Sequence, residues 1–412
     1  MIWIEPAGRD PAGDHPLLPQ RPCRWGAFVM AGDKMNQSRF LTDMNRSAME
    51  ELAVSIGQPR FRGRQLFHWV HGRLETDLKR MSNLPAAFVA RRVDNVGVAS
   101  AELAKELLSA DGSTRKALLR LADRQTVETV LIESAAPEHE GERYTVCVSS
   151  QVGCALGCAF CVTGQVGFVR QLTPGEIVEQ VYHFERSLRK AARLRSGGEE
   201  RFVTNVVFMG MGEPLANYDA VMSAVRLLMD PDGLGLGARR ITISTAGLIP
   251  GIDRLAGERL SLGLAVSLHA ASDQLRDRLM PINRRYPIGP LLQATARYAE
   301  KTGRRVTYEY ALMEGVNDSV VQARQLAKLL AGQLCHVNLI PLNQSLDPSL
   351  RPSSTQRVAA FRKVLEDAHI PCTVRETRGQ DILAACGQLR YTASRSSEPG
   401  GPGLRSRVRR SR

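Results

Sequence analysis

The second half of the chain alternates between apolar segments and amphipathic segments, and this alternation limits the folds that the chain can adopt. From Tyr144 onward the two kinds of segment recur about every 30 residues, as in repeated βα units around a parallel sheet. The predicted strands are 145–149, 205–211, 240–247, 262–270, 306–313 and 336–342. One of the helices between them begins with a capping box at Thr173 and Glu176. The pattern predicts an α/β fold, an open (β/α)6 partial barrel, with its functional groups at the carboxyl ends of the strands.

Three cysteines lie close together in the stretch CVSSQVGCALGCAFC, which begins at Cys147. Cys154, Cys158 and Cys161 have the spacing C-x3-C-x2-C, and three thiolates on one short loop can hold three corners of a [4Fe-4S] cluster. Zinc and an inert buried cysteine cluster are the alternatives, but a closed zinc site needs four ligands and no other Cys or His stands nearby. The spacing, with Phe160 before the last cysteine, resembles the signature of the radical S-adenosylmethionine superfamily.

Small and polar residues stand at the carboxyl ends of the predicted strands. Gly212 and Glu213 follow the strand at 205–211, where glycine permits close approach to the backbone and the carboxylate can accept a hydrogen bond from an amino group. The other candidates are Ser244, Ser267, Leu268, His269 and Asn343. Each alone is more often a structural group. Because parallel strands bring these residues to one edge, we predict that together they form a cradle for S-adenosylmethionine.

The charge balance predicts a polyanionic partner. Lys and Arg outnumber Asp and Glu by 55 to 42, which gives a net charge of +13 and makes nucleic acid the leading candidate. The chain has no run of about 18 apolar residues and no basic, then apolar, leader, so we expect a cytoplasmic protein with no membrane contact. Eight cysteines in 412 residues, three of them clustered, favour a metal site in a reducing compartment over a disulfide framework.

Composition divides the chain into five segments. We expect a disordered extension at 1–36, a helical accessory domain at 37–100, a small β segment at 101–143, the barrel core at 144–391 and a basic disordered tail at 392–412. In the accessory domain two amphipathic helices meet at Gly57, and arginines interleave with aromatic residues such as Phe61 and Trp69. This mixture suits phosphate contact and base stacking. An ordinary helical subdomain with a solvated arginine face is the alternative.

Three further residues are candidates because of their surroundings. Glu128 lies within an apolar strand, and since a buried carboxylate is costly unless it is paired, it either faces water at an edge or has a function. Cys147 and Cys386 lie outside the C-x3-C-x2-C set, in CVSSQVGC and AACGQL. A buried cysteine is usually a small hydrophobic residue, and that remains the alternative for each.

The motifs VETV, CVSSQVGCALGCAFC, GMGEPLANY, ISTAG, SLHA, MPIN, EGVND, NLIPLN and ACGQL, in this order and spacing, resemble the RlmN/Cfr family of radical S-adenosylmethionine RNA adenine methyltransferases. The resemblance runs from about Asn45 to Arg390. It implies a partial (β/α)6 barrel with a small N-terminal helical RNA-binding domain. It also implies cluster ligands at the three clustered cysteines and S-adenosylmethionine contacts at the seven strand-end residues.

The resemblance also implies a mechanism and its partners. One [4Fe-4S] cluster serves each chain, and two molecules of S-adenosylmethionine are consumed per methylation. Cys386 first takes a methyl group, a radical then joins that carbon to an adenine, Glu128 acts as acid or base near the base, and Cys147 releases the product by forming a disulfide with Cys386. The implied substrates are an adenosine in the peptidyl-transferase region of 23S rRNA and an anticodon-loop adenosine in tRNA. An electron donor such as flavodoxin and a monomeric enzyme are expected.

Two alternatives to C2 methylation remain. The antibiotic-resistance branch of the family methylates C8 of the same rRNA adenosine, with the same active-site residues. The segments IGQPRFRGRQLFHWVHGR and VETVLIE resemble the housekeeping branch and favour C2. From another class of function, a non-catalytic RNA-binding iron–sulfur protein would have a structural cluster and dispensable Cys147 and Cys386.

Overall fold

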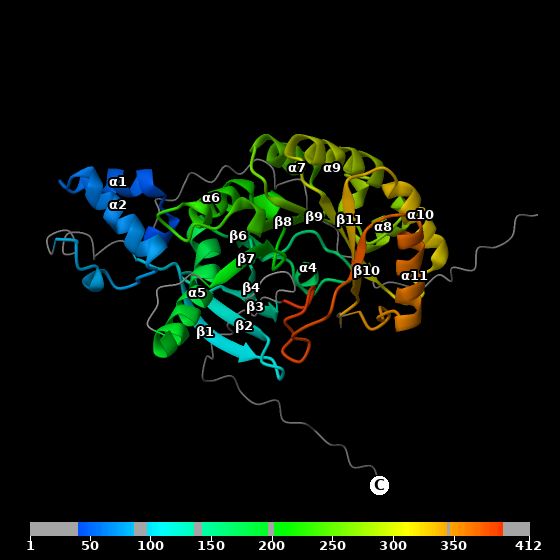
Figure 1. Cartoon of the computed structure of the whole chain (residues 1–412), viewed down its shortest axis with the longest axis horizontal. Helices are drawn as coiled ribbons and strands as arrows, with labels where there is room; N and C mark the ends of the chain where they lie inside the picture. Colours follow the sequence, from blue (N-terminus) through cyan, green and yellow to red (C-terminus); the bar gives the residue numbers. More distant parts are fainter. Residues whose placement is uncertain (1–39, 86–96, 136–141, 197–201, 344–346, 390–412) are drawn as a thin grey trace, which may run out of the picture.

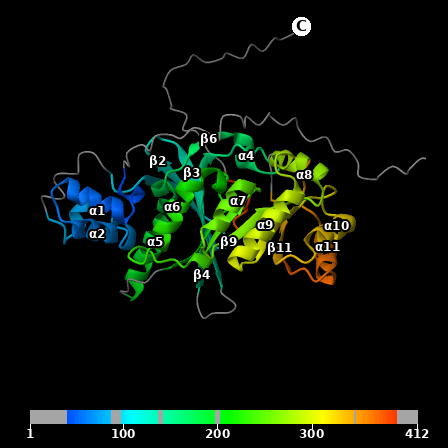
Figure 2. The same ribbon diagram turned by 90° about the horizontal axis from the view of Figure 1, so that it is seen from above.

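The computed structural model describes residues 40–85, 97–135, 142–196, 202–343 and 347–389. The extension expected at 1–36 and the tail expected at 392–412 lie outside the described residues. Within the described ranges, one large sheet carries helices on its outer face, and a small helical unit stands at one end (Figures 1 and 2). No helix in these ranges combines the length and the apolar character needed to cross a membrane.

The large sheet has ten strands in the order β1-β2-β3-β4-β7-β8-β9-β10-β11-β12. Their bounds are β1 Ala101–Leu108, β2 Thr114–Leu121, β3 Thr126–Ala135, β4 Glu142–Cys147, β7 Val203–Phe208, β8 Ile241–Thr245, β9 Gly263–Ser267, β10 Val306–Leu312, β11 Cys335–Pro341 and β12 Cys372–Val374. Neighbours from β1 to β4 are antiparallel, and neighbours from β4 to β12 are parallel. The parallel strands confirm the predicted partial barrel.

Two short strands form a separate hairpin, β5 Gln151–Gly153 with β6 Phe168–Gln171. The helices of the barrel are α4 Val162–Val166, α5 Pro174–Ser196, α6 Tyr218–Met229, α7 Ile249–Gly257, α8 Asp273–Leu279, α9 Ile288–Thr302, α10 Val320–Leu330 and α11 Thr355–Asp367. Their apolar stripes are buried, as at Val221, Val225 and Leu228 of α6, while the opposite faces carry charge. The strands supply Ile243, Val266 and Tyr308 to the same core.

The strands β1 to β3 were expected as a small β segment that leads into the barrel. They form that antiparallel arrangement, but β3 also pairs with β4 over Val130 to Ala135, so the same sheet continues from them into the barrel. The turn between β1 and β2 contains Asp111 and Gly112. The division of the chain into domains at 101–143 remains a prediction.

The N-terminal unit consists of α1 Arg46–Ser55 and α2 Arg60–Phe67, and the chain continues from α2 into a π-helical turn, η2 His68–Gly72. The break at Gly57 separates the two helices as predicted, and Asn45 caps α1 through its side chain. Buried His71 attaches the unit to the barrel, because its ring nitrogens lie 2.7 Å from the Tyr182 hydroxyl on α5 and 3.0 Å from the Met44 carbonyl.

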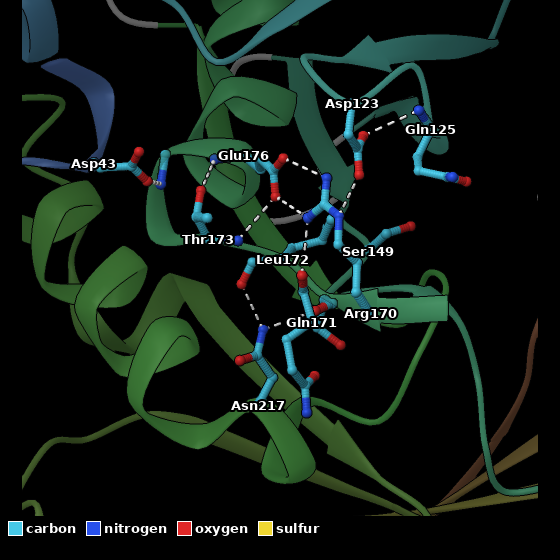
Figure 3. A network of polar contacts seen from close by, with 12 residues as sticks. Asp43, Asp123, Gln125, Ser149, Arg170, Gln171, Leu172, Thr173, Glu176 and Asn217 are labelled. Carbon is cyan, nitrogen blue, oxygen red and sulfur yellow. Dashed lines mark hydrogen bonds and ion pairs between the residues drawn. The ribbon is translucent and has the colours of Figure 1, made fainter. Parts of the chain in front are cut away.

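A polar network fixes the start of α5 (Figure 3). Thr173 and Glu176 form the predicted capping box, with reciprocal bonds of 2.9 and 3.2 Å. Arg170 of β6 also makes two 2.8 Å bonds to Glu176 and one of 2.7 Å to Asp123, in the turn between β2 and β3. Asp43 accepts a 2.8 Å bond from Gly175. The first turn of α5 therefore connects the N-terminal unit, the antiparallel strands and the barrel.

Candidate functional site

The three clustered cysteines lie on the loop between β5 and α4, beyond the carboxyl end of β4. The loop is tied down at both ends, because Cys154 donates its amide to the Gly167 carbonyl at 2.9 Å and Cys161 donates to the Cys158 carbonyl at 3.2 Å. The middle of the loop is held by a 3.0 Å bond from the Ala159 amide to the Leu279 carbonyl at the end of α8. The loop therefore has a fixed shape.

The chemistry of these thiols suits an iron–sulfur cluster. Burial raises the pKa of Cys158 well above its usual value, and negative charge on Cys161 and Cys154 raises it further. Burial also raises the pKa of Cys161. Three such thiols become thiolates only beside strong positive charge, which a cluster supplies.

His269 packs against the cysteine loop at Phe160. Its ring packs edge-on against Phe160 with the centroids 4.6 Å apart, and its backbone adopts a φ of 56°. The Nδ1 atom accepts a 2.9 Å bond from the Ala311 amide, so the ring proton is on Nε2. Burial lowers the pKa of His269 to about 3, and the ring is therefore neutral. His269 is placed to orient the loop that carries the cysteines.

Gly212 and Glu213 follow β7, as predicted. Gly212 has a φ of 100°, and a Cβ there would lie 2.6 Å from the Cβ of Gln151, so the position requires glycine. The buried Glu213 carboxylate accepts bonds from the Leu215 amide at 3.0 Å and the Ala246 amide at 2.8 Å. Burial still raises its pKa to about 7. A cationic ligand stabilises a buried carboxylate whose pKa is raised, and a protonated amino group is such a ligand.

Arg276 of α8 holds the ends of two neighbouring strands, β8 and β9, together. Its guanidinium is fully buried. It donates bonds of 2.7 Å to the Ala246 carbonyl, 2.9 Å to the Ser267 carbonyl, 3.1 Å to the Leu268 carbonyl and 2.9 Å to Asn283 Oδ1. The Ala246 peptide thus lies between Arg276 and Glu213. The structure therefore brings Glu213, Ser267 and Leu268 together through a residue that the sequence did not single out.

The remaining strand-end candidates differ in what they can contact. Ser244 and Ser267 are half-buried near the carboxyl ends of β8 and β9. The side chain of Leu268 is fully buried in the main core, so only its backbone can contact a ligand. Asn343, after β11, donates a 3.0 Å bond to the Cys386 carbonyl and accepts one of 3.0 Å from Gln380. Asn343 therefore anchors the segment that carries Cys386.

Cys386 arrives from the far end of the chain beside the cysteine loop. The Gly387 carbonyl accepts a 2.9 Å bond from Val162, the residue after Cys161, and the Leu389 carbonyl accepts one from the Thr163 hydroxyl. On its other side the segment packs on β3 and β4, where Cys147, Val130 and Met211 form one apolar cluster with Ala384 and Leu389. The segment therefore lies between the cysteine loop and Cys147.

Negative charge on Cys386 influences the ionisation of Cys147. Burial raises the pKa of Cys147 to about 12, and negative charge on Cys386 contributes to this shift. The guanidinium of Arg375, just after β12, opposes it. The Arg375 pKa is itself raised, chiefly by Cys386 and also by Glu309 and Cys147. All cysteines in the described ranges are free thiols, so the disulfide implied by the family resemblance is not formed in this structure.

Glu128 is buried on β3 and is not an edge residue facing water. Its carboxylate lies 3.1 Å from the Lys116 ammonium on β2. Its backbone amide donates to the sulfur of Met211 at 3.5 Å, and Met211 packs against Cys147. Glu128 is thus a buried, paired carboxylate on a strand whose backbone contacts the apolar cluster that contains Cys147.

Sequence reasoning missed Arg276, Lys116 and Arg375. Arg276 lies in a short amphipathic helix whose other charged residues are exposed or half-buried, and Lys116 alternates with apolar residues as a solvent-facing strand residue would. Lys116 pairs with Val130 and Glu128 pairs with Leu118, so the two charged residues are diagonal neighbours across β2 and β3, which nothing local indicates.

Comparison with known proteins agrees with this arrangement. Residues 148–327 match the model of the radical SAM superfamily, and residues 40–91 match that of the ribosomal RNA large subunit methyltransferase N-terminal domain. A Moorella thermoacetica protein named probable dual-specificity RNA methyltransferase RlmN is 48% identical over 84% of this chain and 95% of its own length. The Magnetococcus marinus dual-specificity RNA methyltransferase RlmN is 46% identical over 88% and 98%.

A solved structure has the same fold. The crystal structure of a radical SAM methyltransferase from Sphaerobacter thermophilus is 48% identical, covers 85% of this chain and 99% of its own, and superposes with a TM-score of 0.79. Identity at this level covers most of both chains. The chain belongs to the RlmN family of radical S-adenosylmethionine RNA methyltransferases.

Proposed function

We propose that this protein methylates C2 of an adenosine in 23S rRNA, in the peptidyl-transferase region, and of an anticodon-loop adenosine in tRNA. The observation that carries the proposal is the position of Cys386, which lies between the cysteine loop and Cys147. A cysteine held on both sides in this way can accept a methyl group on one side and be released by a second thiol on the other.

The proposed cofactors are one [4Fe-4S] cluster per chain, held by Cys154, Cys158 and Cys161, and S-adenosylmethionine, two molecules of which are used per methylation. When bound together, they supply a 5′-deoxyadenosyl radical. The proposed contacts to S-adenosylmethionine come from Gly212, Glu213, Ser244, Ser267, Leu268, His269 and Asn343. Glu213 would accept from the amino group, Gly212 would allow backbone approach and Leu268 would contribute its main chain. His269 and Asn343 would act mainly through the loop and segment that they position.

The cysteines have complementary proposed roles. The Cys386 thiolate attacks the methyl carbon of the first S-adenosylmethionine, so that the methyl group is transferred to Cys386 Sγ and S-adenosylhomocysteine leaves. Cys147 remains a protonated thiol at neutral pH, because burial raises its pKa to about 12, and it is therefore not oxidised before the base is joined. Its sulfur later attacks Cys386 Sγ, which releases the methylated base and forms a disulfide that an external reductant must open.

Glu128 is the proposed acid/base group. It would accept the proton lost from the attacked carbon of adenine while the base is joined to Cys386. Its burial next to Met211, in the cluster that contains Cys147, supports this role. The reaction needs an unstacked base, since a base inside a helix cannot reach a buried carboxylate.

The N-terminal unit is the proposed RNA-binding domain, at 37–100. Arg60 and Arg64 are more than half exposed, and Phe61 is 41% exposed with the Arg62 guanidinium over its ring at 4.7 Å. Exposed cations beside an exposed ring suit phosphate contact and stacking. We also propose a cytoplasmic, monomeric enzyme that receives electrons from a protein such as flavodoxin.

The test is anaerobic reconstitution with iron and sulfide, followed by reaction of rRNA and tRNA with S-adenosylmethionine and a reductant. Mass spectrometry of the nucleosides should reveal 2-methyladenosine. 8-Methyladenosine would overturn the assignment of C2, and the absence of any methyladenosine would support the non-catalytic alternative. The Cys147→Ala variant should accumulate a covalent RNA–protein adduct on denaturing gels. Normal methylation by this variant without an adduct would refute the role of Cys147.

A further inference from the structure

The ammonium group of Lys116 lies between the acid/base carboxylate and the segment that carries Cys386. Its Nζ is 3.1 Å from Glu128 Oε1 and 3.1 Å from the carbonyl oxygen of Leu383, three residues before Cys386. The side chains of Lys116 and Glu128 are each only 9% exposed. One buried cation therefore binds two groups that are 255 residues apart in the chain.

Both contacts of Lys116 depend on the charge of Glu128. A buried ammonium is stable only where an anion and further acceptors replace its water. Glu128 supplies the anion, and the Leu383 carbonyl supplies a neutral acceptor. Without the carboxylate charge, an ammonium bonded to one carbonyl is poorly compensated, and the flexible lysine side chain turns towards solvent.

Leu383 itself is held in an unusual conformation. Its φ of 52° lies in the left-handed region, which is unfavourable for a leucine, and its side chain is 37% exposed. Its amide bonds to the Gln380 carbonyl at 3.0 Å, and the next amide bonds to the Gly379 carbonyl at 2.8 Å. Both of these bonds lie within the turn itself, whereas the bond from Lys116 to the Leu383 carbonyl ties the turn to β2.

The same antiparallel strands grip the Cys386 segment at two other points. The amide of Ala110 donates a 2.8 Å bond to Asp381 Oδ2, and Arg378 donates a 2.6 Å bond to the Glu133 carbonyl. Figure 1 shows the orange-red segment that carries these residues beside the cyan strands. Neither bond involves Glu128, so they provide a control for contacts that only fasten the segment.

We propose that Lys116 is a positioning residue that couples the charge of Glu128 to the fixation of the Cys386 segment. While Glu128 is a carboxylate, Lys116 fastens the Leu383 peptide and keeps Cys386 beside the cysteine loop. When Glu128 has taken a proton from the base, Lys116 releases the peptide, and Cys386 can move towards Cys147. The role of Glu128 as the base rests on the proposed function; the coupling itself does not.

The test is hydrogen exchange of the reconstituted full-length enzyme, read by mass spectrometry on peptides covering 378–389. Lys116→Met and Glu128→Gln should each reduce protection of the Leu383 and Ala384 amides, by roughly tenfold to a hundredfold, because each removes a charged bond. The double variant should exchange no faster than either single variant, because both changes break one link. Lys116→Arg, which keeps the charge, should restore most of the protection.

Asp381→Ala is the matched control, since it removes a bond from the same segment to the same strands. In the Asp381→Ala, Glu128→Gln double variant, the increase in exchange rate should equal the product of the increases in the two single variants. The coupling would be overturned if Lys116→Met left the protection unchanged. It would also be overturned if the exchange rate of the Lys116→Met, Glu128→Gln double variant rose by the product of the two single increases. Exchange is measured without RNA, so its result does not depend on methylation. The coupling can be refuted although the wild-type enzyme makes methyladenosine, or supported although it makes none, and the two proposals are therefore tested separately.

Discussion

Replacement of Arg276 by Met should destabilise the barrel and abolish binding of S-adenosylmethionine. The variant keeps most of the aliphatic volume but removes four bonds, of 2.7 to 3.1 Å, from a fully buried cation. Loss of a bond from a charged donor costs about 1.5 to 3 kcal/mol. Relief from burying the charge, which already lowers the Arg276 pKa to about 10, returns several kcal/mol. We expect a net loss of about 3 to 5 kcal/mol.

Thermal unfolding of the apo-protein measures this loss, and roughly 6 to 10 °C in Tm is expected. Arg278→Met is the matched control, because Arg278 is exposed on the same helix, and it should change stability by less than about 0.5 kcal/mol. Calorimetric titration of the reconstituted variants then tests the site. If the Tm of Arg276→Met lies within about 2 °C of the wild-type Tm, or if Arg278→Met lowers the Tm as much as Arg276→Met does, the reasoning about the buried guanidinium is wrong.

Three further predictions concern other parts of the molecule. Burial lowers the pKa of His71 from 6.5 to about 4, so the contribution of His71 to folding stability is complete above pH 6.5 and is lost as the pH falls towards 4. As the pH falls over this window, the protection of the amides of 40–85 against hydrogen exchange should decrease in wild type and not in His71→Gln. Gly212→Ala should lose S-adenosylmethionine binding in calorimetry, because its Cβ meets Gln151, while Gly237→Ala, whose Cβ meets nothing within 4 Å, should bind normally. Arg64→Ala should weaken RNA binding uniformly across sequences and lower the slope of log affinity against log salt by about 0.7 to 1 in filter binding; an unchanged slope would argue against phosphate contact.

The sequence predicts well those features that local patterns determine. Six parallel strands, the break at Gly57 and the Thr173–Glu176 capping box follow from periodicity and from residue types that begin or end elements. The C-x3-C-x2-C spacing likewise places its three cysteines on one loop.

Features that depend on pairing between distant segments were not predictable. Lys116 has the pattern of a solvent-facing strand residue, but the Cys386 segment covers it after the chain returns from β12. Arg276 is buried only because the ends of β8 and β9 present three carbonyl groups to α8. The bonds from both ends of the Asn343 amide to the Cys386 segment also come from the tertiary fold, and its contact with S-adenosylmethionine remains a prediction. Such contacts follow from the tertiary fold and leave no local signal.

The central claim is that the methyl carbon rests on Cys386 before it reaches adenine. Its most direct test is a single turnover of enzyme whose Cys386 carries a 13C-labelled methyl group, with unlabelled S-adenosylmethionine as the only other methyl source. The first methyladenosine formed should contain the label, and its amount should equal the amount of labelled methyl group lost from the peptide that contains Cys386. Unlabelled product from the first turnover, with the label still on Cys386, would contradict the account.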